Sequence, residues 1–132
     1  MANAIYPKYK EAVLQSASDS SLTGTVKAAL VDTGTYTYSA AHQFLSSLTG
    51  VVGTAQTLGT KTYADGVFDA ADITYTGVTG SSAEAIVLYI DTGTAGTSRL
   101  VAFFDTGFTG LPVTPNGGDI TINWNASGIF AL

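Results

Sequence analysis

Two apolar stretches separated by a short turn-forming segment constrain the fold of this chain more than any other feature. Residues 83–91 read AEAIVLYID, residues 98–105 read SRLVAFFD, and TGTAGT connects them. Each stretch has the length of a strand and is apolar at both odd and even positions. A strand with apolar side chains on both faces is covered on both sides by other elements. The pattern predicts an antiparallel hairpin at the centre of a layered β-protein.

Alternating patterns elsewhere predict shorter strands around this hairpin. In residues 119–125, DITINWN, two isoleucines and a tryptophan alternate with Thr and Asn, and TVKAALVD at 25–32 opens with alternation. Further strands are expected around 51–58, 60–64 and 72–78 and in the closing segment SGIFAL. Because turn residues separate these stretches at regular intervals, we predict an all-β chain, a jelly-roll-like β-sandwich of about eight short strands.

The composition agrees with this class and excludes several functions. Charged residues make up 11% of the chain, against roughly 25% in an ordinary soluble domain, and hydrophobic residues make up 45%. The net charge is −5, and the five Lys and Arg residues do not cluster. Since proteins that neutralise phosphates need clustered cations, no nucleic-acid partner is expected. No cysteine occurs, so no disulfide or thiolate metal site is expected.

Two short helices are expected beside the strands. Residues 4–16, AIYPKYKEAVLQS, carry apolar side chains at the spacing of one helical face, and Pro7 is tolerated in a first turn. Such a short helix must dock on its own sandwich or on a neighbouring subunit. We therefore divide the chain into an N-terminal helix or arm, 1–20, and a β-sandwich domain, 21–132. A second short helix is predicted near residues 39–46, capped by Ser39.

The triplet Asp-Thr-Gly occurs three times, at 32–34, 91–93 and 105–107. Aspartic proteases carry this triplet around each of two carboxylates that share one proton. They supply one motif per half or per subunit, and three copies in one chain fit neither arrangement. Each copy follows a predicted strand, where Asp bonds its own backbone and Gly takes a positive φ. We interpret the triplets as turns and expect no enzymatic activity.

Other chemical candidates are weaker. His42 is the single histidine and is expected to be a partly buried structural residue. Asp69 and Asp72 provide too few oxygen ligands for calcium, and no segment has the pattern of a cofactor-binding loop. No catalytic residue, metal or cofactor is therefore expected. The seven tyrosines, Tyr36 and Tyr38 among them, leave open an aromatic platform for carbohydrate binding, with core packing as the plainer interpretation.

Several long strings resemble a known family as a set. They are TVKAALVDTGTYTYSAAHQFLSSLTGV, DGVFDAADITYTGVTG, EAIVLYIDTGTAGTSRLVAFFDTG and GLPVTPNGGDITINWNASGIF, with the opening MANAIYPKYKEA. Over nearly the whole chain they resemble small tailed-bacteriophage head-associated proteins, the cement or capsid decoration proteins. The resemblance implies a jelly-roll-like fold on the outside of an icosahedral head, clamping adjacent major capsid subunits. It carries over no catalytic residue.

The expected function is therefore that of a phage virion structural protein. The expected partners are the major capsid protein and a second copy of the chain, as a homodimer or alternatively a trimer. The protein would be made in the bacterial host cytoplasm and lie on the outer capsid surface, with no membrane partner. The alternatives are a tail or fibre component and a carbohydrate-binding β-sandwich module. The candidate capsid or subunit contacts are Ile5, Tyr6, Tyr9 and Val13.

Overall fold

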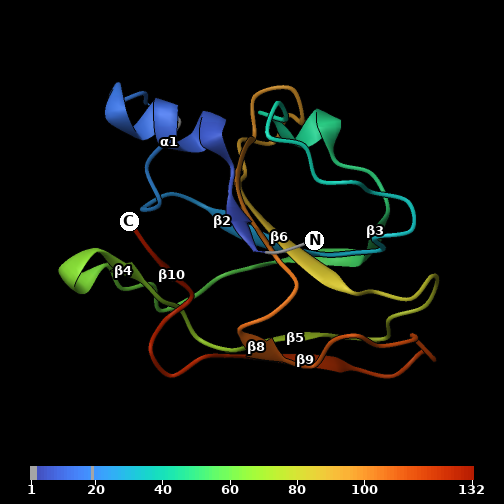
Figure 1. The fold of residues 1–132 in the computed structure, drawn as a ribbon. Coiled ribbons are helices and arrows are strands. Elements are labelled where there is room, and N and C mark those ends of the chain that lie inside the picture. Colours follow the sequence, from blue (N-terminus) through green and yellow to red (C-terminus); the bar gives the residue numbers. More distant parts are fainter. Residues whose placement is uncertain (1–2, 19) are drawn as a thin grey trace.

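The computed structural model describes residues 3–18 and 20–132, and antiparallel strands dominate it (Figure 1). Strands account for 36% of the residues and helix for 11%, which confirms the expected all-β, sandwich-like fold. The larger sheet has the order β1-β7-β6-β2-β3, formed by Ala4–Ile5, Arg99–Phe104, Ala85–Ile90, Val26–Val31 and Val51–Thr57. The smaller sheets are β5-β9-β8, formed by Ile73–Tyr75, Ile120–Trp124 and Phe108–Thr109, and β10-β4, formed by Phe130–Ala131 and Val67–Phe68.

The predicted central hairpin is confirmed as β6 and β7. The two strands pair antiparallel with Val87 opposite Phe103, and β2 pairs with the other edge of β6. Every residue of β6 and β7 is buried. Figure 1 shows the reason: α1 lies over one side of the five-stranded sheet, and β5, β9 and β8 lie over the other. Two covered faces require apolar side chains at consecutive positions.

The three-stranded sheet shows the alternation expected of a half-covered layer. In β9, Ile120, Ile122 and Trp124 are buried and the residues between them are exposed. The Tyr75 hydroxyl in β5 donates to the carbonyl of Ala28 in β2 over 2.7 Å, which joins the two layers through a buried hydrogen bond. Hydrophobic burial and this bond together fix the spacing of the sandwich.

The N-terminal segment differs from the predicted helix over 4–16. Ala4–Ile5 form β1, which pairs with β7, and helix α1 spans only Pro7–Leu14. The Tyr6 backbone N–H still donates to the carbonyl of Val101 over 3.0 Å. Pro7 has no N–H to continue this ladder, and its fixed φ suits the first position of a helix. The change from strand to helix therefore occurs at the proline.

Two further expectations are corrected in the loops. The helix expected near 39–46 is a short 3₁₀ turn at Leu45–Ser47, and the Ser39 hydroxyl accepts the Ala41 N–H in a preceding turn. Leu45 donates its N–H to the carbonyl of Ser98 over 2.7 Å, so a tertiary contact holds the segment. The strand expected at 60–64 is reduced to one bridge, because the chain reverses through the 3₁₀ turn Ala64–Gly66.

Candidate functional site

Two of the predicted contact residues, Tyr6 just before α1 and Tyr9 within it, face the protein's own core. Tyr6 and Tyr9 are 0% and 1% exposed. The Tyr9 hydroxyl donates to the carbonyl of Ser20 over 3.0 Å, and burial raises the pKa of Tyr9 to about 12. The apolar face of the helix thus packs within the same chain. While α1 stays docked, Tyr6 and Tyr9 cannot reach a partner.

The other two predicted contact residues are only partly covered. Ile5 belongs to β1 and packs against the edge of the core, and Val13 lies near the end of α1. Strand and helix place the four predicted residues in different surroundings, so they do not form one contact face. Of the four, Val13 alone lines a surface hollow.

Tyr6 takes part in a buried hydrogen-bonded chain. Its hydroxyl lies 2.7 Å from that of Tyr36, which in turn lies 2.8 Å from Nδ1 of His42. Burial and the hydrogen bond to Tyr36 raise the pKa of Tyr6 far above its ordinary value. His42 is half-buried and packs its ring 5.4 Å from that of Tyr36. This accounts for His42 as a structural residue.

The same geometry bears on the tyrosines considered for carbohydrate binding. Tyr36 is 2% exposed, and its hydroxyl is occupied by Tyr6 and His42. A ring buried in this way cannot serve as a stacking platform. Tyr38 is half-buried and keeps part of its surface accessible.

An apolar surface lies where the C-terminus passes between α1 and the β4-β10 pair (Figure 1). Two hollows of about 140 and 250 Å³ share Leu132 as a lining residue. Leu14, Leu132 and Tyr63 are 86%, 63% and 43% exposed, although large apolar side chains are usually buried. We call this the terminal apolar surface, and it consists of Val13, Leu14, Leu22, Tyr63, Val67, Phe130 and Leu132.

Among the side chains that line the two hollows of the terminal apolar surface, Lys10 is the charged one. Lys10 lines the hollow beside Leu14 and Leu132, and the long stem of a lysine can cover apolar area. Lys8 on the same helix is paired with Glu11 over 3.1 Å. Contiguous exposed apolar side chains with a polar rim are typical of a protein contact site. Helical periodicity indicates Val13 but not Leu14 or Leu132, because the proximity of those two leucines depends on the path of residues distant in the sequence.

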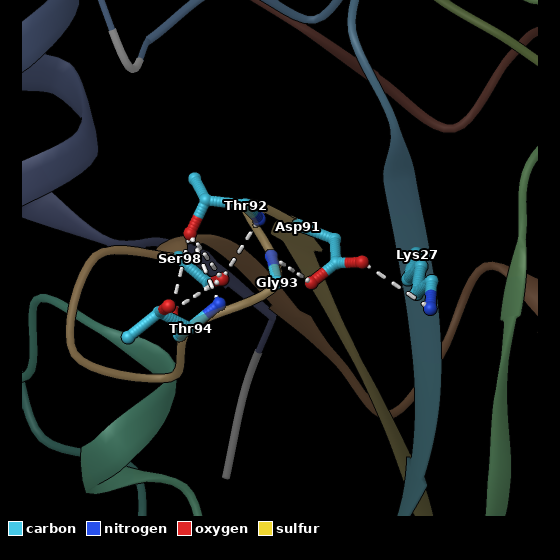
Figure 2. Close-up of polar contacts among 6 residues, drawn as sticks. All are labelled: Lys27, Asp91, Thr92, Gly93, Thr94 and Ser98. Atoms are coloured by element: carbon cyan, nitrogen blue, oxygen red, sulfur yellow. Dashed lines mark hydrogen bonds and ion pairs between the residues drawn. The ribbon is translucent and has the colours of Figure 1, made fainter.

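The second Asp-Thr-Gly triplet forms a turn at the end of β6 (Figure 2). The Gly93 N–H donates to Asp91 Oδ1 over 3.1 Å, and the other carboxylate oxygen lies 3.3 Å from Lys27 Nζ. The backbone bond from Gly93, more than the ion pair, lowers the pKa of Asp91. Gly93 has φ of +88°, which a side chain would disfavour. Thr92 and Ser98 close the turn through hydroxyl contacts.

The other two triplets are turns of different construction. Asp32 Oδ1 accepts the Gly34 N–H over 2.8 Å, although Gly34 does not take the positive φ that was expected. The backbone N–H of Asp105 donates to Asn3 Oδ1 over 2.7 Å, so the N-terminal segment holds the third turn. Because β2 and β6 are antiparallel, Asp32 and Asp91 lie at opposite ends of the sheet. The three carboxylates therefore do not gather at one site.

The acidic residues considered for calcium have backbone partners. Asp69 Oδ1 accepts the Ala70 N–H, and Asp72 Oδ1 accepts the Trp124 N–H, both over 2.9 Å. Within residues 3–18 and 20–132, no three His, Cys, Asp or Glu side chains are grouped to hold a metal ion. Nor does any helix in that part of the chain have the length and apolar character to cross a membrane.

Comparison with known proteins adds no relative. No protein-family model matches the chain, and no curated protein matches it. The terminal apolar surface is thus the candidate functional site on structural grounds alone.

Proposed function

We propose that this chain is a tailed-phage virion structural protein that binds the outer capsid surface and reinforces contacts between major capsid subunits. The resemblance of its long sequence strings to phage cement and decoration proteins supports the phage assignment. The sandwich-like fold is compatible with a compact module attached to a shell. The observation that carries the proposal is the terminal apolar surface.

The terminal apolar surface has the properties of a protein contact. Leu14 extends into solvent from the last turn of α1, and Leu132 lies beside it at the chain end. Burying a leucine side chain of this exposure contributes about 1.5–3 kcal/mol. Tyr63 adds a ring whose hydroxyl is already bonded to the Leu22 carbonyl over 2.9 Å, so docking need not leave that hydroxyl without a partner. Apolar anchors inside a polar rim provide most of the affinity of ordinary protein interfaces.

Capsid geometry strengthens a contact of modest area. A shell offers the same joint many times, and a dimer that spans two joints binds the second as an intramolecular step. A homodimer would therefore bind a capsid more tightly than a single copy does. The major capsid protein and a second copy of the chain are accordingly the proposed partners.

Co-sedimentation with capsids that lack the protein tests the proposal. Purified protein is mixed with such capsids and pelleted, depletion of the supernatant is measured against protein concentration, and the loaded particles are heated. Saturable depletion with a raised disruption temperature is the expected result. Protein that stays in the supernatant at all concentrations contradicts the proposal, and binding to purified tails instead would favour a tail component.

Variants of the terminal apolar surface show whether this surface makes the contact. Leu14→Lys places a charge on the terminal apolar surface, and we expect the capsid affinity to fall by about tenfold or more, since a leucine anchor is lost and a charge is desolvated. The matched control is Val51→Lys, because Val51 is 44% exposed on β3 and lies outside the surface. Equal affinities for the two variants would assign the contact to another face. Circular dichroism confirms that both variants are folded.

A further inference from the structure

A second hollow, outside the terminal apolar surface, opens where β2 and β7 end. It is a cleft of about 310 Å³, large enough for one extended side chain. Its lining combines the aromatic residues Tyr36, Tyr38 and Phe103 with two carboxylates, Glu84 and Asp105, and two threonines. Thr33 and Asp105 belong to two of the Asp-Thr-Gly turns, but neither these turns nor the proposed capsid contact accounts for Glu84 and the aromatic residues beside them.

The accessible aromatic wall of the cleft is the ring of Tyr38. This ring is half-buried and is held by the ring of Tyr6 at 5.1 Å and that of Phe103 at 5.7 Å between centroids. Both neighbours are at most 1% exposed, so they fix Tyr38 from the core side. A ring held in place can receive a ligand at little entropic cost.

The Glu84 carboxylate is also held in place. Its Oε1 accepts the Thr33 N–H over 2.9 Å and the Thr33 hydroxyl over 3.1 Å. The Glu84 backbone N–H donates to the carbonyl of Val31 over 3.0 Å, which attaches the residue to the end of β2. Asp105 follows directly after β7 and lines the same cleft. The Glu84 carboxylate thus places negative charge beside the aromatic residues of the cleft.

This chemistry selects the charge of a ligand. None of the residues that line the cleft is Lys, Arg or His, so an anionic ligand would meet two carboxylates and no positively charged side chain of the lining. A bare metal ion needs more oxygen ligands than two carboxylates provide, and no three-residue metal cluster occurs in the described part of the chain. An organic cation gains from both features, because a ring face and a carboxylate each attract positive charge.

We propose that this cleft binds the guanidinium group of an arginine side chain from a partner protein. A guanidinium is planar, can stack on the Tyr38 ring while donating to Glu84, and is less strongly hydrated than an ammonium group. The assignment to a protein side chain rests on the proposed function, in which the chain lies against other subunits. The cleft would then add a specific polar anchor to an otherwise apolar attachment.

Titration with small probes tests the site without a capsid. Nα-acetyl-arginine methylamide is added to the isotope-labelled full chain, and amide and Tyr38 ring resonances are followed by NMR. The isosteric citrulline derivative, which is neutral, is the matched probe, and the lysine derivative and methyl glycosides are further arms. Arginine should shift resonances around Thr33 and Glu84 with an affinity about fivefold or more above that of citrulline. Added salt should weaken this binding.

Three variants identify the groups responsible. Glu84→Gln keeps an oxygen for Thr33 but removes the charge, and Tyr38→Leu removes the ring; each should lower the arginine affinity about threefold or more. Tyr38→Phe keeps the ring and should bind like the original protein. The control for lost charge is Asp65→Asn, at a carboxylate outside the cleft. Its arginine affinity should not change.

Defined outcomes overturn the inference. Equal binding of arginine and citrulline excludes recognition of charge, and equal binding of lysine excludes a guanidinium preference. Saturation by a glycoside, or no shifts near the cleft with any probe, overturns the site itself. Because the probes are free amino-acid derivatives, a negative titration leaves the capsid co-sedimentation result unaffected, and the two proposals fail separately.

Discussion

Asp91 shows how single residues stabilise the strand ends of this protein. Its carboxylate accepts the Gly93 N–H within the turn and pairs with Lys27 on the neighbouring strand β2 (Figure 2). The first contact is local and comes with the Asp-Thr-Gly sequence. The second depends on the pairing of β2 with β6. Both favour the ionised carboxylate and lower the pKa of Asp91.

Replacing Asp91 should make the stability depend less on pH. In the folded protein the pKa of the Asp91 carboxyl is lowered. The stabilisation that the ionised carboxylate gives to the folded state is therefore present above the ordinary pKa of 3.8, and it is lost as the pH falls through the folded pKa. Asp91→Ala should destabilise the protein by about 1 kcal/mol at pH 7, because both contacts are partly exposed to solvent. The difference in the free energy of unfolding between this variant and the original protein should shrink below pH 3.8. Urea unfolding at several pH values measures it.

Lys27→Met provides the companion variant. This variant removes the ion pair but keeps the hydrogen bond from the Gly93 N–H. It should therefore lower the free energy of unfolding by about 0.5 kcal/mol, which is less than the effect of Asp91→Ala. If Lys27→Met lowers the free energy of unfolding as much as Asp91→Ala does, then the ion pair, rather than the hydrogen bond from the Gly93 N–H, is the main contact of Asp91.

At the level of elements, β1 and α1 belong to the sandwich more closely than an arm would. β1 pairs with β7, and α1 buries Tyr9 and Ala12. Tyr6, at the junction, is fully buried and bonded to Tyr36. The exposed end of α1, at Val13 and Leu14, is the part left available for a partner. Of the two roles that the sequence left open for this helix, docking on its own sandwich is the one seen in the structure.

Deletion of residues 1–16 should therefore destabilise the whole protein. It removes the partner of one edge of β7 and two buried tyrosines, and loss of one large aromatic side chain from a core costs about 3–5 kcal/mol. We expect loss of the cooperative thermal transition in calorimetry, which would prevent the truncated chain from serving as a test of capsid binding. A truncated chain with an unchanged transition would instead show that the segment is a separable arm.

The matched control for the deletion is Leu14→Ala. This side chain is 86% exposed, so shortening it should change the stability by less than about 0.5 kcal/mol. The comparison separates the buried half of the segment from its exposed end.

At the scale of the whole molecule, buried tyrosine hydroxyls connect the layers. Tyr75 joins the three-stranded sheet to β2, Tyr9 joins α1 to the loop after it, and Tyr6 joins the N-terminal segment to Tyr36. Burial raises the pKa of Tyr9 to about 12 and those of Tyr6 and Tyr75 further. The folded state therefore keeps these phenols neutral where an unfolded chain would ionise them.

Alkaline unfolding should follow from this arrangement. The pKa values of these buried tyrosines are raised in the folded state. The stabilisation that the neutral phenols provide is therefore complete below the ordinary tyrosine pKa of about 10. It is lost as the pH rises from that value toward the folded ones. A spectrophotometric titration should show the buried tyrosines ionising in one steep step together with loss of the circular dichroism signal. Smooth ionisation of all seven tyrosines near pH 10 with the fold intact would contradict this.

Tyr75→Phe is the control variant for that titration. It removes one phenol from the buried class and should reduce the amplitude of the steep step by one tyrosine. It should also lower the stability by about 1–2 kcal/mol, because the Ala28 carbonyl loses a buried hydrogen bond.

The sequence by itself determined the class of fold and its centre. Successive side chains of a strand point to opposite faces of the sheet. Consecutive apolar residues in β6 and β7 therefore required that both faces be covered, and the alternation in β9 required that one face be covered. The Asp-Thr-Gly turns after β2 and β6 were also predictable, because Asp bonds to an N–H two residues along the chain. These features follow from contacts close in sequence.

The tertiary structure alone decided which surfaces are free. Periodicity identified an apolar face on residues 4–16, but only the docked structure shows Tyr6 and Tyr9 inside and Leu14 outside. The hollow shared with Leu132 and the cleft between Glu84 and Tyr38 join residues far apart in the sequence. Local patterns say that a side chain is apolar or charged. What lies beside it depends on how the strands pair and how the segments between them run, and these are properties of the folded whole.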